Sequence, residues 1–506
     1  MLVLAVVLAP VAPVAPSADL QSRSPGVTVD MLDQLQGDAG GDDSFESVDV
    51  EVEAIVELRR GTSLPNEVSV QREYTRAGTR LVRVDVQMSR VRELSRDPRI
   101  KQIRIDGRSV ETTRRTAPGV SDVHADRLHW QGITGDGVTV GIIDGGFRPS
   151  NPEIAGNVAG YRVFDSDGEW THGTGVASVV VDTAPNATLH LAAVGPTTTP
   201  AEYRTAVRWL RDSGADVIVD SGSYFGSSGD SHGDITTVAE SAADDVLFVT
   251  SAGNYAQRHW TGTHEATGDR QWLQFGQNQG NPLGDGLVSG EVSVGLRWDD
   301  PEGDYDLYLM RQRTGEDEVV AASKVRQNGT VTATERVTAR LPRGSYYVAV
   351  RAHDANGHHR VELFATHELG HASPNASLTA PGTAPSVVTV GSYGHDGVKP
   401  FSSRGPAGNH TGVDVVAPDS VRAAGLDGEE GTSYAAPYVA GTAALLYSQY
   451  PDLPPAQTRS LIRSSARDVG PTGPDVASGY GVVDARSAHM IAEWQSRYDR
   501  LNSTTG

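Results

Sequence analysis

The stretch Val138-Thr-Val-Gly-Ile-Ile-Asp144-Gly-Gly decides the fold. Its apolar run predicts a buried strand that ends in an acid followed by glycines. From residue 117 onward, strand-like runs alternate with helical ones, which indicates a parallel sheet covered by helices. Open α/β sheets bind their ligands at the carboxyl ends of their strands. The sequence therefore predicts an α/β domain with a site near Asp144.

Two further segments carry residues suited to nucleophilic chemistry. His172 opens a helix of small residues in Thr171-His-Gly-Thr-Gly-Val-Ala-Ser178, and Ser433 stands at a helix start in Gly431-Thr-Ser-Tyr-Ala-Ala-Pro437. A serine nucleophile needs a base that takes the hydroxyl proton and a carboxylate that orients this base. Asp144, His172 and Ser433 supply these three groups. The alternative, a turn acid and two helix caps, requires all three motifs to coincide by chance.

The three segments, in the order Asp, His, Ser, resemble the subtilisin-like serine proteases, or subtilases. The sequence around Ser251-Ala-Gly-Asn254 is similar to the part of the family that holds its oxyanion-hole asparagine. The resemblance implies that Asp144 orients His172 and that His172 is the general base. It further implies that Ser433 attacks the scissile carbonyl and that Asn254 donates to the oxyanion.

The family's substrate-binding segment falls on Ser221, Gly222 and Ser223, preceded by an unusual Asp220. The chain departs from the family in two further places. The histidine motif reads HGTGVAS where HGTHVAG is usual, and Tyr434 stands where methionine is common. Neither change touches an atom of the expected triad, but both can reshape its surroundings.

The resemblance implies an α/β fold: a subtilisin-like parallel sheet flanked by helices, with a small α+β prodomain and an inserted all-β sandwich. The expected segments follow in chain order. They are a signal-peptide-like run at 1–18, a linker at 19–45, a propeptide-like inhibitor module at 46–112, the two parts of the catalytic domain at 117–258 and 380–490, the inserted sandwich at 260–370 between them, and a polar C-terminal tail at 491–506.

The texture of the sequence supports these divisions. Residues 48–58, 81–86 and 100–105 read as strands, with a short helix through Met88, Val91 and Leu94. This module resembles the family's propeptide, and an unrelated small β/α domain is the alternative. Residues 260–366 show short alternating strands separated by turns, typical of a sandwich, and resemble domains appended to secreted bacterial peptidases. For this insert, substrate docking and a spacer role both stay open.

Composition narrows the possible partners and the compartment. Acidic residues outnumber basic ones 64 to 43, so the net charge of -21 disfavours nucleic-acid binding. The chain has no cysteine, which excludes disulfides and thiol nucleophiles. Its first 18 residues are apolar, contain three prolines and end in small residues, like the rear of a secretory signal. We therefore expect a secreted monomer without a transmembrane segment.

Metal-binding patterns are also present. His367-Glu-Leu-Gly-His371 fits the HExxH motif of zinc proteases, although the nearby Pro374 leaves little room for the helix that this motif needs. Acidic clusters at 165–167 and 299–306 offer oxygen ligands suited to calcium. Such clusters also arise by chance in so acidic a chain. A structural calcium ion is thus possible, and the chemistry itself needs no cofactor.

Together these observations predict a secreted subtilisin-like serine endopeptidase that hydrolyses protein or peptide substrates through an acyl-enzyme. By the same resemblance it is made as a zymogen that processes itself and is inhibited by its own prodomain. Two alternatives remain: a catalytically silent protein that binds peptides or surfaces, and an HExxH zinc protease.

Overall fold

The computed structural model separates the chain into two compact units, residues 1–110 and 111–506. Each unit is described here by itself. The described residues are 51–59, 62–64, 69–76, 79–87, 94, 97, 99–105, 117–165, 170–195, 198–224, 234–266, 271–300, 302–326, 333–354, 357–421 and 429–503.

The first unit contains an antiparallel sheet with the strand order β2-β3-β1-β4. Its strands are β1 (Glu51–Leu58), β2 (Ser69–Arg76), β3 (Thr79–Gln87) and β4 (Ile100–Ile105). Alternate residues of β1 and β3 are buried in one cluster with Leu94. The expected strands at 81–86 and 100–105 are present, whereas the expected helix lies mostly outside the described residues. The sequence reading missed β2 because its polar, charged residues carry no apolar alternation.

The second unit is built on an eight-stranded sheet with the order β19-β18-β9-β8-β5-β7-β6, in which β20 also pairs with β18. All its described pairings are parallel except the one between β18 and β19. The strands are β5 (Thr139–Asp144), β6 (Val158–Val163), β7 (Thr188–Ala193), β8 (Val217–Asp220), β9 (Leu247–Ser251), β18 (Val388–Gly394), β19 (Gly397–Val398) and β20 (Val415–Pro418). The parallel strands thus share one carboxyl edge and one amino edge.

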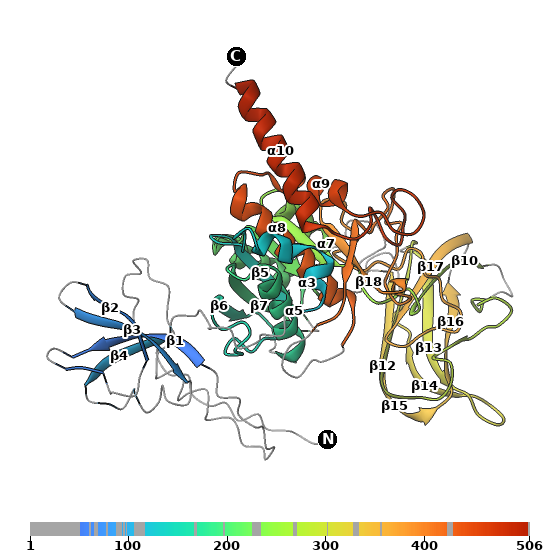
Figure 1. Ribbon diagram of the computed structural model, residues 1–506. Coiled ribbons are helices and arrows are strands. Elements are labelled where there is room, and N and C mark those ends of the chain that lie inside the picture. The colour runs from blue at the N-terminus through green and yellow to red at the C-terminus, as the bar shows by residue number, and fades with distance from the viewer. Residues whose placement is uncertain are drawn as a thin grey trace. The chain divides into compact units, whose positions relative to one another are not determined.

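Helices cover both faces of this sheet (Figure 1). α5 (Trp170–Thr183) and α8 (Thr432–Gln449) pack on one face, where α3 (Gly119–Asp122) and α4 (Ala125–His129) join them. α6 (Pro200–Asp212) and α7 (Asp234–Ala243) pack on the other face. The strands are therefore apolar on both sides, as parallel sheets require.

Between β9 and β18 the chain forms a sandwich of two four-stranded antiparallel sheets, with the orders β10-β17-β12-β15 and β11-β16-β13-β14. The two sheets lie face to face (Figure 1), and a continuous cluster of apolar residues is buried between them. The strands are β10 (His259–Ala266), β11 (Asn281–Pro282), β12 (Val288–Trp298), β13 (Asp304–Arg311), β14 (Glu318–Ser323), β15 (Thr334–Gly344), β16 (Tyr346–Asp354) and β17 (Gly357–Ala365). The predicted fold class, a subtilisin-like α/β sheet with an inserted all-β sandwich, is confirmed.

The chain ends in α9 (Pro455–Ser465) and α10 (Ala485–Ser503). Here the structure differs from the expected polar tail at 491–506, because α10 runs through most of it. Ala488 and Ala492 of α10 pack against Leu446 of α8 and Leu461 of α9, which holds the first half of the helix. Within the described part of the chain, every helix is too short or too polar to cross a membrane.

Candidate active site

Asp144 and His172 are joined directly at the carboxyl edge of the sheet. His172 Nδ1 lies 2.9 Å from Asp144 Oδ1 and 3.0 Å from Oδ2. Asp144 is only 4% exposed, whereas the side chain of His172 is 37% exposed. The Gly145 N–H also donates to Asp144 Oδ1 at 2.7 Å. A buried carboxylate therefore holds the Nδ1 side of an imidazole ring that is partly exposed to solvent.

The glycine after His172 explains this contact. A Cβ atom on Gly173 would lie 2.2 Å from the carbonyl oxygen of Gly146 and 3.0 Å from Asp144 Cβ. Contacts this short are forbidden, so only glycine lets the first turn of α5 rest on the loop after β5. The His-Gly pair thus brings the histidine over the end of the strand.

Ser433 lies in the first turn of α8, beside the end of β8. The Ser433 hydroxyl donates to the Ser221 carbonyl at 3.2 Å, and the Ser221 hydroxyl donates to the Ser433 carbonyl at 3.0 Å. The next residue, Tyr434, is 2% exposed, and its ring centroid lies 5.2 Å from that of His172. Ser433 is therefore joined to the expected substrate-binding segment, and the residue after it packs against His172.

Asn254 is held against the start of α8. Its side-chain oxygen accepts from the Thr432 N–H at 3.1 Å and from the Thr432 hydroxyl at 3.0 Å. Gly253, at a φ of +96°, makes the turn after β9, and its N–H donates to Thr432 Oγ1 at 3.1 Å. These bonds occupy the oxygen of the Asn254 amide and leave its NH₂ group as a donor beside Ser433.

The expected substrate-binding residues form the segment that leaves β8. Ser221 is 5% exposed, and the carbonyl of Gly222 accepts from the Ser251 hydroxyl at 3.3 Å. Ser223 hydrogen-bonds to Tyr255, whose pKa is nevertheless raised to about 12, mainly by burial. The segment is thus tied to β9 and to the chain that follows it.

Asp220, the last residue of β8, is completely buried. Its carboxylate accepts from the Tyr203 hydroxyl at 2.6 Å, the Gly222 N–H at 2.8 Å and the Tyr224 hydroxyl at 3.4 Å. Burial raises its pKa to about 7, and the nearby charge of Asp144 adds to this rise. Asp220 is unusual in the sequence, but its tyrosine partners could not be predicted, because they come from α6 and from the segment after β8.

The HExxH segment does not form a helix. Residues 367–371 are bends around Leu369, which forms a β-bridge with Leu283. Because HExxH binds zinc through two histidines on one helical face, the arrangement lacks the geometry that the motif needs. Among the described residues, no three His, Asp or Glu side chains gather as a metal site would require. The candidate calcium cluster at 165–167 lies partly outside those residues.

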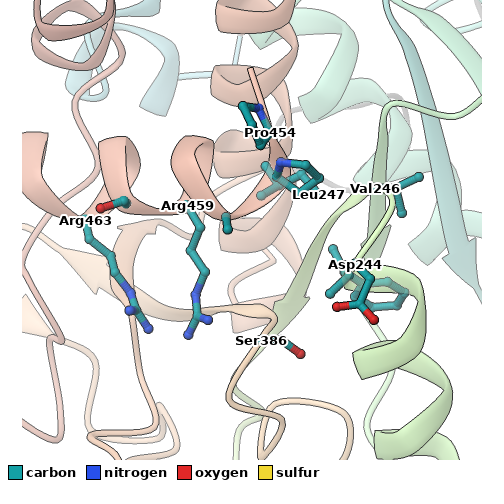
Figure 2. Close-up of a pocket in the computed structure, with 12 residues that line it drawn as sticks. Asp244, Val246, Leu247, Ser386, Pro454, Arg459 and Arg463 are labelled. Carbon is teal, nitrogen blue, oxygen red and sulfur yellow. The ribbon is translucent and has the colours of Figure 1, made fainter. Parts of the chain in front are cut away.

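A cavity of about 370 Å³ lies at the opposite, amino edge of the sheet (Figure 2). It is bounded by the beginning of β9 and by α9, whose Arg459 and Arg463 point the same way in the figure. Asn254 follows the other end of β9, so this strand, roughly 16 Å long, separates the cavity from the expected site. The cavity therefore plays no part in the Asp144–His172 arrangement.

Comparisons with known proteins identify a family for this chain. The family model described as the Subtilase family matches residues 135–292 and 351–481, more than half of the chain. The gap between the two matched ranges, 293–350, falls within the sandwich.

Curated relatives match parts of the chain. Mycosin-1 of Mycobacterium tuberculosis is 41% identical over 121 residues, which cover 21% of this chain and 26% of that protein. Subtilisin E of Bacillus subtilis is 29% identical over 194 residues, which cover 34% of this chain and 49% of that protein. The chain thus spans about half or less of the length of these relatives.

Two solved structures are also similar. A lanthipeptide protease aligns with a TM-score of 0.44 and 19% identity, over 74% of this chain and 95% of that one. MycP1 with its N-terminal propeptide removed aligns with a TM-score of 0.41 and 21% identity, over 73% and 96%. The family model matches the chain on both sides of the inserted sandwich and covers more than half of the chain. The chain therefore belongs to the subtilase family.

Proposed function

We propose that this protein is a serine endopeptidase that hydrolyses peptide bonds in protein or peptide substrates. The observation that carries the proposal is the contact of His172 Nδ1 with both oxygens of the buried Asp144. Ser433, in the first turn of α8, supports the proposal, because the residue after it packs against His172. Membership of the subtilase family supports the same reaction.

In the proposed reaction, His172 takes the proton of the Ser433 hydroxyl while Ser433 Oγ attacks the carbonyl carbon of the scissile bond. Because this hydroxyl donates to the Ser221 carbonyl at 3.2 Å, it first turns toward His172. Asp144 holds the proton on Nδ1 and stabilises the imidazolium. His172 then protonates the leaving amine, and water releases the acyl group from Ser433 by the reverse steps.

Asn254 is the proposed donor to the oxyanion of the tetrahedral intermediate. Its oxygen is already engaged by Thr432, which precedes Ser433, so its NH₂ group is left to donate to the oxyanion. A preorganised donor of this kind acts where negative charge develops. The substrate backbone would lie along Ser221, Gly222 and Ser223.

We further propose that the protein is exported and made as a zymogen. The apolar run at 1–18 and the compact unit before residue 111 support this proposal. Processing would occur between Thr112 and Ala117, after the last strand of that unit. The released unit would remain as a non-covalent inhibitor that weakens on dilution.

Casein hydrolysis by the wild type and by Ser433→Ala tests the peptidase. We expect the variant to lose about a million-fold in rate, as subtilisin does without its nucleophile, while its fold is kept. Glu368→Ala serves as the matched control, because the HExxH segment is not helical, and it should keep full activity. Undiminished hydrolysis by Ser433→Ala would refute the proposal, and loss in Glu368→Ala alone would favour zinc chemistry.

N-terminal sequencing tests self-processing. In a host free of other proteases, the wild type should begin between residues 113 and 117, and Ser433→Ala should stay uncut. A variant that is processed as well as the wild type would show that another protease makes the cut, for which Arg114-Arg115 offers a site.

A further inference from the structure

The carboxyl edge of the sheet holds an acidic residue that the proposed reaction does not use. Asp220 ends β8, and its register partners are Ile143 on β5 and Thr250 on β9. Two residues earlier, on the same face, stands Ile218, which packs in the apolar cluster beneath α6 and α7. By its position, Asp220 belongs to a largely apolar face, on which Ile143, Ile218 and Phe248 pack.

The side chain of Asp220 folds back on its own backbone. Its Oδ1 accepts the N–H of Gly222, two residues later, at 2.8 Å, which closes an Asx-turn. The Tyr203 hydroxyl holds the other oxygen at 2.6 Å, and Tyr203 itself is completely buried. Tyr224 crosses the turn so closely that a Cβ on Gly222 would lie 2.7 Å from its hydroxyl. The carboxylate thus determines the shape of the chain from Asp220 to Tyr224.

This turn contains the residue that holds Ser433. Ser221 lies between Asp220 and Gly222, whose N–H donates to the Asp220 carboxylate. Ser221 also exchanges two hydrogen bonds with Ser433. Its own N–H donates to the Ile143 carbonyl at 3.3 Å, one residue before Asp144. A change in the turn would therefore move the carbonyl that receives the Ser433 hydroxyl.

Stability alone does not account for Asp220. The titratable groups that face it are Tyr203 on α6, Tyr224 after β8 and Asp144 on β5, and no described lysine or arginine neutralises it. Burial raises the pKa of Asp220 to about 7, which means that the folded chain holds its charge at a cost. Isolated charges of this kind concentrate at functional sites.

We propose that Asp220 is a positioning residue: through the Gly222 N–H its carboxylate sets the turn that holds Ser221, and through Ser221 it sets the orientation of the Ser433 hydroxyl. The inference rests on the proposed function. It assigns Asp220 no contact with substrate.

The test measures how fast Ser433 reacts with a dialkyl fluorophosphate, a small reagent that bonds to a reactive serine and releases fluoride. Such a reagent needs little of the substrate-binding segment, so it reports on the hydroxyl itself. In Asp220→Ala and Asp220→Leu, which remove the acceptor, we expect the second-order rate constant to fall about 10- to 100-fold. Leucine also fills the space of the Asp220 side chain with apolar atoms. If the alanine variant does not fold, the rate constant of the leucine variant is the one that tests the inference.

Asp220→Asn separates the hydrogen bond from the charge. Its amide oxygen can still accept from Gly222, so it should react within about threefold of the wild type. The matched control is Asp216→Ala. Asp216 precedes β8 and, like Asp220, accepts a backbone N–H, that of Thr139 at 2.8 Å. Because Asp216 lies at the opposite, amino edge of the sheet, its replacement should leave the rate unchanged.

Two results would overturn the inference while the proposed function stands. One is a folded Asp220→Ala or Asp220→Leu that reacts as fast as the wild type. The other is an Asp220→Asn that loses as much as the alanine variant, because the charge and not the turn would then matter. Failure of the proposed function is recognised separately, by casein hydrolysis that survives in Ser433→Ala.

Discussion

Both edges of the parallel sheet bury aspartates, but the partners of these aspartates differ between the two edges. At the amino edge, Asp414 is 1% exposed and pairs with Arg459 and Arg463 of α9. At the carboxyl edge, Asp144 and Asp220 are equally buried, and their described partners are an imidazole, tyrosine hydroxyls and backbone N–H groups. At the amino edge the carboxylate is paired with two cations, whereas at the carboxyl edge no described lysine or arginine pairs with Asp144 or Asp220.

This difference separates a structural edge of the sheet from an edge suited to chemistry. A buried ion pair such as that of Asp414 tolerates little change but performs no chemistry. A buried carboxylate with neutral partners can stabilise a positive charge that forms during a reaction, such as the imidazolium of His172. We expect substitutions at the carboxyl edge to change turnover and substitutions at the amino edge to change stability. Four predictions follow this contrast, in order of their effect on turnover.

Asp144→Asn should lower kcat about 10,000-fold, because an amide favours the wrong tautomer of His172. The fold should remain intact, since the amide can still accept from the Gly145 N–H. The measurement is kcat for a short peptide substrate, together with a thermal midpoint. A loss of less than tenfold would break the comparison at its strongest point.

Asn254→Ala should lower kcat about 100- to 1000-fold, the cost known for the equivalent donor of subtilisin, with little change in KM. The reason is that Asn254 donates only where charge develops in the transition state. Steady-state kinetics on the same peptide separate the two constants. A rise in KM at constant kcat would instead place Asn254 in ground-state binding.

Asp220→Asn should change kcat by less than about threefold but should change how stability depends on pH. The unfolded carboxyl ionises near its ordinary value of 3.8, whereas the pKa in the folded chain is about 7. The folded state therefore binds the extra proton between these values, and wild-type stability falls as the pH rises from about 4 to about 7.

The asparagine variant lacks this proton, so its free energy of unfolding relative to the wild type should rise across the same range and level off above it. Each unit of pKa shift corresponds to about 1.4 kcal/mol. Urea unfolding at several pH values measures the difference. A constant difference from pH 4 to 8 would mean that Asp220 carries no such cost.

Asp414→Asn, at the amino edge, should leave kcat within about twofold of the wild type. It removes the negative charge that pairs with Arg459 and Arg463 and leaves these two largely buried cations without a counter-ion, so the free energy of unfolding should fall by roughly 3 kcal/mol. Denaturant unfolding and kinetics on the same sample test both expectations. A large loss of turnover without loss of stability would mean that the two edges are not functionally distinct.

Much of the fold could be predicted from the sequence because parallel strands and their helices leave local patterns. β4 was predicted with its observed bounds, and β5 ends at Asp144, the acid that ends the predicted strand. Two features were missed for physical reasons. β2 is polar and is held mainly by pairing with β3, and α10 extends into a segment whose composition resembles a tail. Pairing and packing of this kind are not visible in local composition.

The candidates for chemistry could be found from local patterns, because the motifs of Asp144, His172 and Ser433 lie at the ends of recognisable elements, where backbone groups and side chains are exposed to a ligand. How these ends meet depends on contacts in the folded chain. Gly173 lets α5 touch the loop after β5, and Asp220 closes a turn on Ser221 with help from a tyrosine on α6. These contacts join residues far apart in the chain, and their strength depends on burial, which a sequence pattern does not specify.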